Sequence, residues 1–177
     1  MAIPVTELEA VTLGCVATLG PCTAYKLRQR FQASPSACFS GSAGSIYPLL
    51  ERVEERGLVA SRAADTGRRK ALEYTITRSG RAALRAWLKS SLDAREVAAD
   101  DPLRTRMLFL EELPAAARLA WLDDAEQAVR DHLALVDEFE GGGAQTLGAE
   151  LANDNARRLG RARLAWLAEA RARWSEA

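Results

Sequence analysis

The sequence of 177 residues has little of what metal and disulfide sites require: one histidine and three cysteines. Protein zinc sites combine Cys and His at characteristic spacings, and Cys15, Cys22 and Cys38 show none of them. There is no run of about 18 apolar residues, the length that a membrane-spanning helix needs. The N-terminal stretch MAIPVTELEA has no basic region followed by an apolar one, as a secretion signal would. We therefore expect no metal, no membrane span and a cytoplasmic location.

The sequence also lacks the motifs of common enzymes. It contains no G-x-S-x-G, no phosphate-binding glycine loop and no Cys/His pair at a catalytic spacing. The glycine run at 141–143 follows no predicted strand, so we interpret it as a hinge between helices. The acidic pairs at 100–101 and 123–124 are interpreted as helix caps and surface groups. A non-enzymatic protein without a cofactor is the resulting expectation.

What the sequence has is an uneven distribution of charge. Its 24 Lys/Arg and 24 Asp/Glu cancel overall, but residues 1–95 hold 14 basic against 8 acidic residues and residues 96–177 hold 10 against 16. A net +6 on one half and −6 on the other favours a polyanionic partner for the first half. Chance variation between two ordinary domains is the alternative, so charge alone does not decide the function.

The stretch from Ser40 to Gly57 is the one around which the first half is organised. Its apolar residues recur at i, i+3, i+4 and i+7, the buried stripe of a helix: Ile46, Leu49, Leu50 and Val53. Gly57 ends this helix. Pro48 allows two starts, one near Ser45 with the proline in the first turn and one at Ser42 with a bend, and we favour the second. A helix with an apolar back and a small polar tip suits insertion into a groove.

Shorter helices are predicted before this stretch. Thr6 and Glu9 have the spacing of a capping box, so a helix should begin at Thr6. A second helix is expected over about residues 23–31, followed by a turn at 32–41.

A hairpin and a further helix are predicted after Gly57. A short extended run at 58–60, a turn at 65–70 carrying three consecutive cations, and a strand with alternating Leu72, Tyr74 and Ile76 predict a hairpin with a positive tip. Thr77 should cap the next helix, whose inward residues are expected to be Leu84, Trp87, Leu88 and Leu92. Three helices, a hairpin and a helix, in this order, are typical of a winged helix-turn-helix.

Three segments then resemble one family. LGCVATLGPCTAYKLRQRF, GSIYPLLERVEERGLV and RRKALEYTITRSGRAALRAWL look like the PadR family of bacterial transcription regulators over about residues 8–92. Where that family commonly has Gly-Tyr in its second helix, this chain has Ala24-Tyr25. The usual proline after the capping serine of the central helix is also missing. The resemblance implies a DNA-binding transcription regulator, with repression as its mode of action.

The second half is predicted to be helical. Asp101-Pro102 is a helix start, Pro114 opens a helix with Leu119, Leu122, Val129, Leu133 and Val136 on one face, and a last helix begins near Gln145. We expect one stripe of this last helix to carry Leu147, Leu151, Leu159, Trp166 and Trp174. Long amphipathic helices need a mate to cover them, and this tail resembles the longer PadR subfamily, in which such a tail makes the dimer.

These inferences define the expected architecture. The fold class is mainly α: a winged helix-turn-helix with a small β-hairpin wing, followed by an α-helical C-terminal dimerisation domain. The expected boundaries are residues 1–92 for the DNA-binding domain, 93–100 for a linker and 101–177 for a dimerisation and effector domain.

Duplex DNA recognition needs cations for the phosphates and a slim element that reaches base edges. We predict a DNA-binding set drawn from the second helix, the tip of the central helix and the wing: Tyr25, Lys26, Arg28, Ser42, Ala43, Ser45, Tyr47, Arg68, Arg69 and Lys70. Serines and small apolar groups read bases only modestly. The alternatives are a solvated loop for the basic turn and a core position for the Tyr47 ring.

A small aromatic effector is implied by the resemblance, because some relatives bind such compounds near the dimer interface. Trp87, Trp121 and Trp166 are the candidates, although tryptophans at helical spacing more often lie in a core or a dimer seam. Cys22 could have a lowered pKa at a helix N-terminus and sense oxidants, but a structural role is the expected one. His132 is expected to be a surface or seam residue.

Two other functions remain open at this point. A winged helix can dock proteins after losing DNA binding, and a dimer can serve as a small-molecule carrier. Binding to duplexes at low salt separates the first from a regulator, since phosphate contacts are strongest there.

Overall fold

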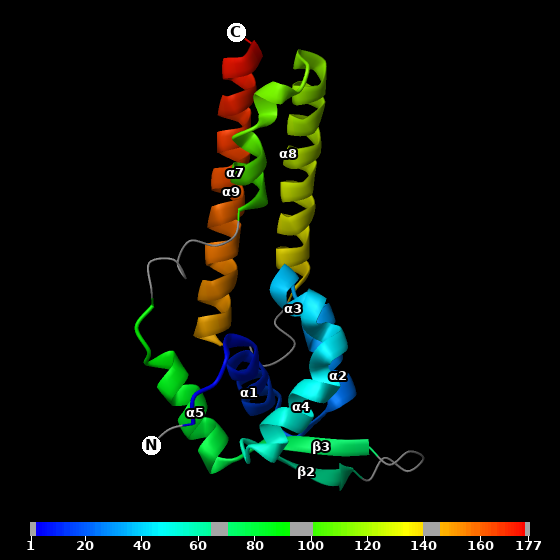
Figure 1. Cartoon of the computed structure of the whole chain (residues 1–177), viewed down its shortest axis with the longest axis vertical. Helices are drawn as coiled ribbons and strands as arrows, with labels where there is room; N and C mark the ends of the chain where they lie inside the picture. Colours follow the sequence, from blue (N-terminus) through cyan, green and yellow to red (C-terminus); the bar gives the residue numbers. More distant parts are fainter. Residues whose placement is uncertain (1–2, 65–70, 93–100, 140–145, 176–177) are drawn as a thin grey trace. The chain divides into compact units, whose positions relative to one another are not determined.

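The computed structural model describes residues 3–64, 71–92, 101–139 and 146–175 (Figure 1). The described residues up to Ser91 form one compact unit, and those from Leu92 onward form a second.

The N-terminal unit combines short helices with a small antiparallel sheet. Its elements, in chain order, are α1 (Glu7–Leu19), β1 (Cys22–Thr23), α2 (Ala24–Gln32), α3 (Ala37–Ser42), the 3-10 turn η1 (Ala43–Ser45), α4 (Ile46–Glu55), β2 (Val59–Ala64), β3 (Ala71–Ile76) and α5 (Arg78–Leu88). The strand order is β1-β3-β2, with Tyr74 paired to Ser61 on one side and to Cys22 on the other. The predicted winged helix-turn-helix is confirmed.

The first helix begins as its capping box predicts. The Thr6 backbone N–H donates to Glu9 Oε2 at 2.9 Å, and the Glu9 N–H donates to Thr6 Oγ1 at 3.3 Å. Leu13 and Val16 of α1 are buried in a core that also contains the inner faces of α2 and α4. This core, made of residues of the N-terminal unit, fixes the short helices against one another.

The predicted cap at Thr77 joins the end of α4 to the start of α5. Thr77 Oγ1 accepts from the Gly80 N–H at 3.0 Å and donates to the Gly57 carbonyl at 2.7 Å. Gly57 has φ +67°, a conformation that side chains rarely adopt. A Cβ at Gly80 would lie 2.0 Å from the Leu58 carbonyl oxygen, so only glycine allows α5 to approach this backbone.

The start of the central helix differs from the favoured prediction. The segment expected to be a turn contains α3, and the α-helix that carries the apolar stripe begins at Ile46 and not at Ser42. The alternative start near Ser45 is therefore the correct one. It places Pro48 in the first turn, where no intrahelical partner exists for its missing N–H.

Several side chains predicted to be buried are exposed. Leu72 is 47% exposed, and Leu88 and Leu92 are 65% and 76% exposed. In α5 the buried positions belong to the small residues Gly80 and Ala83, because the helix packs closely on the Leu58 backbone. Of the alternating strand residues, Tyr74 is the one that is fully buried.

The C-terminal unit consists of helices. They are α7 (Pro102–Met107), the 3-10 turn η2 (Leu110–Glu112), α8 (Ala115–Glu138) and α9 (Leu147–Ser175). As predicted, Asp101 caps α7, accepting from the backbone N–H groups of Leu103 and Arg104 at 3.2 and 3.1 Å. The long helices α8 and α9 run side by side (Figure 1). Their shared core contains Leu122, Ala125, Val129 and Leu167.

Polar contacts reinforce the pairing of α8 with α9. Arg171 forms ion pairs with Asp123 and with Glu126, the latter at 3.4 Å. Arg157 and Asp137 are 2.6 Å apart farther along the pair. Glu126, which breaks the apolar pattern of α8, thus has an ionic partner on the neighbouring helix.

The apolar stripe of α9 is covered only in part. Leu167 is buried and Trp166 and Trp174 pack at the edge of the core, but Leu147, Leu151 and Leu159 are 69%, 58% and 52% exposed. The expectation that a long helix needs a further mate fits this pattern.

Two further findings concern the described parts of the chain. None of their helices is long and apolar enough to cross a membrane. The same residues contain no group of three or more His, Cys, Asp and Glu side chains that could hold a metal ion.

Candidate nucleic-acid interface and ligand pocket

Helix α2 turns one face to the core and the other to solvent. Ala24, Leu27 and Phe31 are buried, and this leaves Tyr25, Lys26 and Arg28 exposed, with Tyr25 at 62%. The start of the helix is fixed by Thr23, whose hydroxyl accepts from the Lys26 N–H at 3.2 Å. Tyr25 also accepts a hydrogen bond from Gln29 at 3.0 Å. The predicted phosphate-contacting side chains of α2 thus share one accessible face.

The exposed face of α4 begins at its first turn. Ile46, Leu49, Leu50 and Val53 are at most 1% exposed, so the helix is held by the stripe that the sequence predicts. Ser45 and Pro48 are exposed, and Tyr47 is 51% exposed. The core alternative for the Tyr47 ring is therefore wrong, because about half of this residue is exposed to solvent.

Two residues just before α4 differ in accessibility. Ser42 is half-buried as a residue, and its hydroxyl donates to the Cys38 carbonyl at 2.6 Å, so its proton is already used within the helix. Ala43 is 4% exposed and belongs to the core. The prediction that Ala43 touches base edges is wrong, because η1 turns its methyl group inward.

The wing is attached to α4 through a side-chain contact. The Ser61 N–H of β2 donates to Glu54 Oε1 of α4 at 3.0 Å. Across the hairpin, Arg62 and Glu73 form an ion pair at 3.1 Å. The predicted wing-tip cations Arg68, Arg69 and Lys70 lie outside the described residues.

An ionic cluster near the C-terminal end of α4 was not foreseen from the sequence. Glu9 of α1 is 3% exposed and contacts Arg56 at 2.8 Å and Arg52 at 3.3 Å. Burial by itself raises the pKa of Glu9, but the Thr6 backbone hydrogen bond and the Arg56 and Arg52 guanidinium groups outweigh it, so the pKa lies below the usual carboxyl value. Arg56 also donates to the Pro4 carbonyl. The capping box identifies Glu9, but no local pattern indicates its partners more than 40 residues away.

Burial favours the neutral form of two thiols of this unit. Burial raises the pKa of Cys22 and also that of Cys15. Cys22 lies in β1 opposite Tyr74. The idea of a lowered Cys22 pKa is therefore wrong, and the structural role expected of this cysteine fits its burial.

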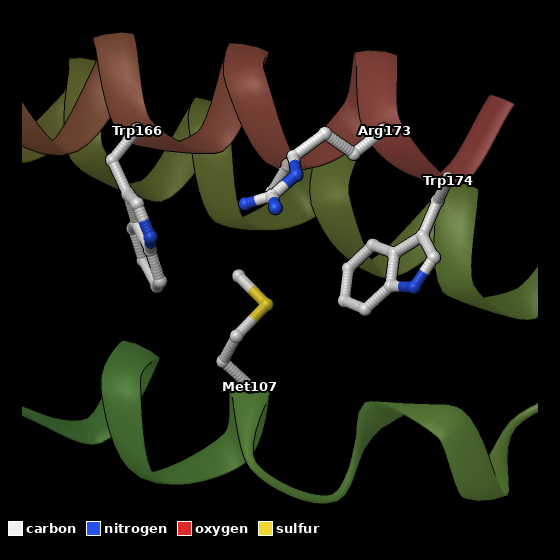
Figure 2. A pocket seen from close by; sticks show the side chains of 5 residues that line it. Met107, Trp166, Arg173 and Trp174 are labelled. Carbon is white, nitrogen blue, oxygen red and sulfur yellow. The ribbon is translucent and has the colours of Figure 1, made fainter. Parts of the chain in front are cut away.

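The C-terminal unit contains a pocket of about 250 Å³ between α7 and α9, lined by Met107, Trp166, Ala170, Arg173 and Trp174. Figure 2 shows the indoles of Trp166 and Trp174 descending from α9 on either side of the Met107 side chain, with the Arg173 guanidinium between them. Arg118 lies 5.8 Å from the centre of the Trp174 ring. Such a site can take a planar aromatic molecule.

Of the predicted effector residues, one lies in this pocket. Trp166 lines it, whereas Trp121 packs at the α8–α9 core and Trp87 is half-buried on α5 in the other unit. Trp174 was placed on the same stripe of α9 but was not among the candidates. Its spacing of eight residues from Trp166, two helical turns, is the signal that could have identified it.

Comparison with known proteins finds a family match within the first unit. Residues 13–86 match the model of the transcriptional regulator PadR-like family, which confirms the predicted resemblance. No curated protein sequence matches the chain significantly.

Solved structures share the fold along nearly the whole chain. A PadR-like transcriptional regulator from Bacillus cereus has a TM-score of 0.80 and 20% identity, covering 98% of this chain and 99% of that one. Bacillus subtilis PadR in complex with operator DNA has a TM-score of 0.81 and 20% identity, covering 97% and 99%. Bacillus subtilis PadR in complex with p-coumaric acid has a TM-score of 0.74 and 20% identity, covering 96% of each chain.

Proposed function

The chain contains a PadR-like transcriptional regulator domain over residues 13–86, and from this premise we propose that it is a homodimeric repressor that binds a palindromic DNA operator. A small aromatic effector bound to the C-terminal unit would release the operator. Dimers of helix-turn-helix modules read half-sites about 34–36 Å apart, and a two-fold symmetric protein selects a two-fold symmetric sequence.

The observation that carries this proposal is the accessible face formed by α2 and α4. Lys26 and Arg28 on α2 supply charge for phosphates. Ser45, just before α4, and Tyr47 in its first turn supply hydroxyl groups at the tip of a slim helix. Both helices are anchored by fully buried stripes, so the face is rigid before DNA arrives. The wing-tip cations Arg68, Arg69 and Lys70 are retained in the proposal as phosphate contacts.

Selection of bound sequences from random duplexes tests the proposal directly. We expect a motif with two-fold symmetry, which establishes DNA recognition and the dimer together. Absence of binding to any duplex at about 50 mM salt would instead favour a protein-docking winged helix, because phosphate contacts are strongest at low salt.

Single substitutions on α2 test the assignment of phosphate contacts. Lys26→Ala and Arg28→Ala should each reduce the slope of log K against log salt by about 0.9 and weaken binding to all sequences alike. Arg158→Ala, which removes the same charge from an exposed site in the C-terminal unit, is the matched control and should leave the slope unchanged.

The exposed leucines of α9 support the homodimer. Leu147, Leu151 and Leu159 lie at least half-exposed on one helix of 29 residues, and a second copy is the mate that would cover them. Sedimentation should give a dimer, and Leu151→Glu should shift it toward monomer. A wild-type chain that sediments as a monomer would overturn the palindromic-operator proposal.

The pocket in the C-terminal unit supports the effector. Bacillus subtilis PadR was solved with p-coumaric acid, and here two indoles, a thioether and a guanidinium surround about 250 Å³. We expect a panel of aromatic compounds to quench tryptophan fluorescence, and the quenching to fall in Trp166→Phe and Trp174→Phe. Trp87→Phe, in the other unit, is the control. A flat response would remove the effector from the proposal and leave DNA binding intact.

A further inference from the structure

We propose that Arg52 is an additional phosphate-contacting residue of the recognition helix α4, and that Glu9 of α1 is the residue that positions it. The proposal rests on the DNA-binding function above and adds two residues to it. Neither lies in the tip of α4, in α2 or in the wing.

Arg52 lies on the same face of the helix as Ser45 and Pro48. It follows Pro48 by one turn and Ser45 by two, at the i, i+3 and i+7 spacing that puts side chains on one face. All three residues are exposed. A cation two turns along from the tip of a groove-inserting helix is well placed for the backbone that flanks the groove.

The two arginines around Glu9 differ in their contacts within the protein and in their exposure to solvent. Arg56 is occupied within the protein, because it contacts Glu9 at 2.8 Å and the Pro4 carbonyl, and its side chain is 30% exposed. Arg52 lies with its Nε 3.3 Å from Glu9 Oε1, and its side chain is 58% exposed. More than half of the Arg52 side chain is therefore open to solvent.

The carboxylate of Glu9 is held rigidly. Glu9 is 3% exposed and also accepts the Thr6 N–H at 2.9 Å. A buried carboxylate with one backbone hydrogen bond and two ion-pair partners holds one position, and an arginine paired with it loses less freedom when it binds a phosphate. The single charge of Glu9 faces two guanidinium groups, so the cluster keeps a net positive charge toward DNA.

The test is a double-mutant cycle with the full chain, measured on the selected operator duplex and on a scrambled duplex. Arg52→Ala should lower the salt slope by about 0.9 and weaken both duplexes alike, by roughly five- to tenfold at 0.1 M salt. Glu9→Gln keeps the shape and the capping role, since glutamine also serves in a capping box. It should leave the slope near that of the wild type and weaken binding roughly threefold.

The decisive comparison is Glu9→Gln in the Arg52→Ala background. If Glu9 acts by positioning Arg52, its loss should have no further effect there. An equal effect in both backgrounds would show that Glu9 serves only the stability of the unit, and an unchanged salt slope in Arg52→Ala would remove Arg52 from the interface. Either result overturns the proposal.

Two controls separate other causes. Circular dichroism identifies a Glu9→Gln chain that fails to fold, and Arg52→Ala alone then decides the matter through its slope. Failure of the wild-type chain to bind any duplex would overturn the DNA-binding function itself, and this inference with it. Arg158→Ala is again the charge-matched control.

Discussion

The two units of this chain are built from the same kinds of residue but bury them differently. Among the described residues, the N-terminal unit gathers fifteen buried side chains around short helices and a hairpin. The shared core of α8 and α9 has four, although these helices have 24 and 29 residues. The first unit is fixed by its own interior, whereas the second leaves the leucines at the start of its longest helix in solvent. A rigid N-terminal unit and an incompletely covered helix in the second unit fit the dimeric DNA-binding protein that we propose.

The largest effect should come from Gly80, where the N-terminal unit is packed most tightly. A Cβ there meets the Leu58 carbonyl oxygen at 2.0 Å, so Gly80→Ala must displace backbone, and we expect a loss of about 4 kcal/mol in the free energy of unfolding. Urea unfolding followed by circular dichroism measures it. Gly44→Ala is the control, because a Cβ at Gly44 meets nothing within 4 Å. A loss below about 1 kcal/mol at Gly80 would contradict the rigid packing inferred here.

The next effect concerns the core of the second unit. Leu167→Ala removes a side chain with no exposure and should lower stability by about 3 kcal/mol. Because Trp121, Trp166 and Trp174 pack against this core and Trp87 lies on α5, tryptophan fluorescence in a Trp87→Phe background reports the C-terminal unit alone. In Leu167→Ala we expect this fluorescence signal to be lost at a lower denaturant concentration than the helical circular dichroism signal of the rest of the chain. Coincident transitions would show that the units unfold as one.

A smaller effect, confined to the N-terminal unit, should follow from pH. The pKa of Glu9 is lowered in the folded chain, so its contribution to stability is present above the usual carboxyl value and is lost as pH falls through the folded value. Arg52 and Arg56 are the charged groups that face it. Urea midpoints between about pH 6 and pH 3 should therefore fall less steeply in Glu9→Gln than in the wild type. Parallel curves would remove Glu9 from the acid sensitivity of this unit.

The smallest effect is expected at the surface of α9. Arg158 and Asp154 form an i, i+4 pair at 2.7 Å, with the arginine side chain 75% exposed. Exposed pairs of this kind contribute little because water and salt screen them, so Arg158→Ala should change the free energy of unfolding by no more than about 0.5 kcal/mol. Thermal unfolding at two salt concentrations measures it. A loss comparable to that of Leu167→Ala would show that polar contacts, more than the core, hold α9 in place.

Much of the fold is visible in local patterns. The Thr6 capping box, the stripe from Ile46 to Val53 and the Asp101 cap are all found where the sequence indicates. The failures have two causes, which are packing between distant segments and the lack of a pattern in runs of small residues. The spacing of Leu88 predicts an inward residue. In the structure, α5 turns Gly80 and Ala83 inward, because the helix approaches the Leu58 backbone closely. Helix α3 was missed because its small residues have no apolar periodicity.

The candidate sites show the same limit. The accessible positions of Tyr25 and Lys26 follow from the amphipathic pattern of α2, and exposure at both is confirmed. Ala43 was misplaced because a small residue gives no indication of which way a 3-10 turn will face. The pairing of Arg52 with Glu9 spans 43 positions, and no periodicity reaches so far. Trp174 was overlooked because the pocket that it lines also requires Met107 of α7, and no spacing along α9 indicates that partner.

The uncovered leucines of α9 also have a consequence for the order of events during synthesis. The N-terminal unit has all its described elements before α7 is translated, so it can acquire its shape while the ribosome is still working on the remainder. Leu147, Leu151 and Leu159 emerge later, on the last described helix. In the proposed homodimer, a newly released chain would carry a folded N-terminal unit and exposed leucines on α9 until it met a second copy. Encounter between newly made chains would then limit how quickly the proposed repressor forms at low expression.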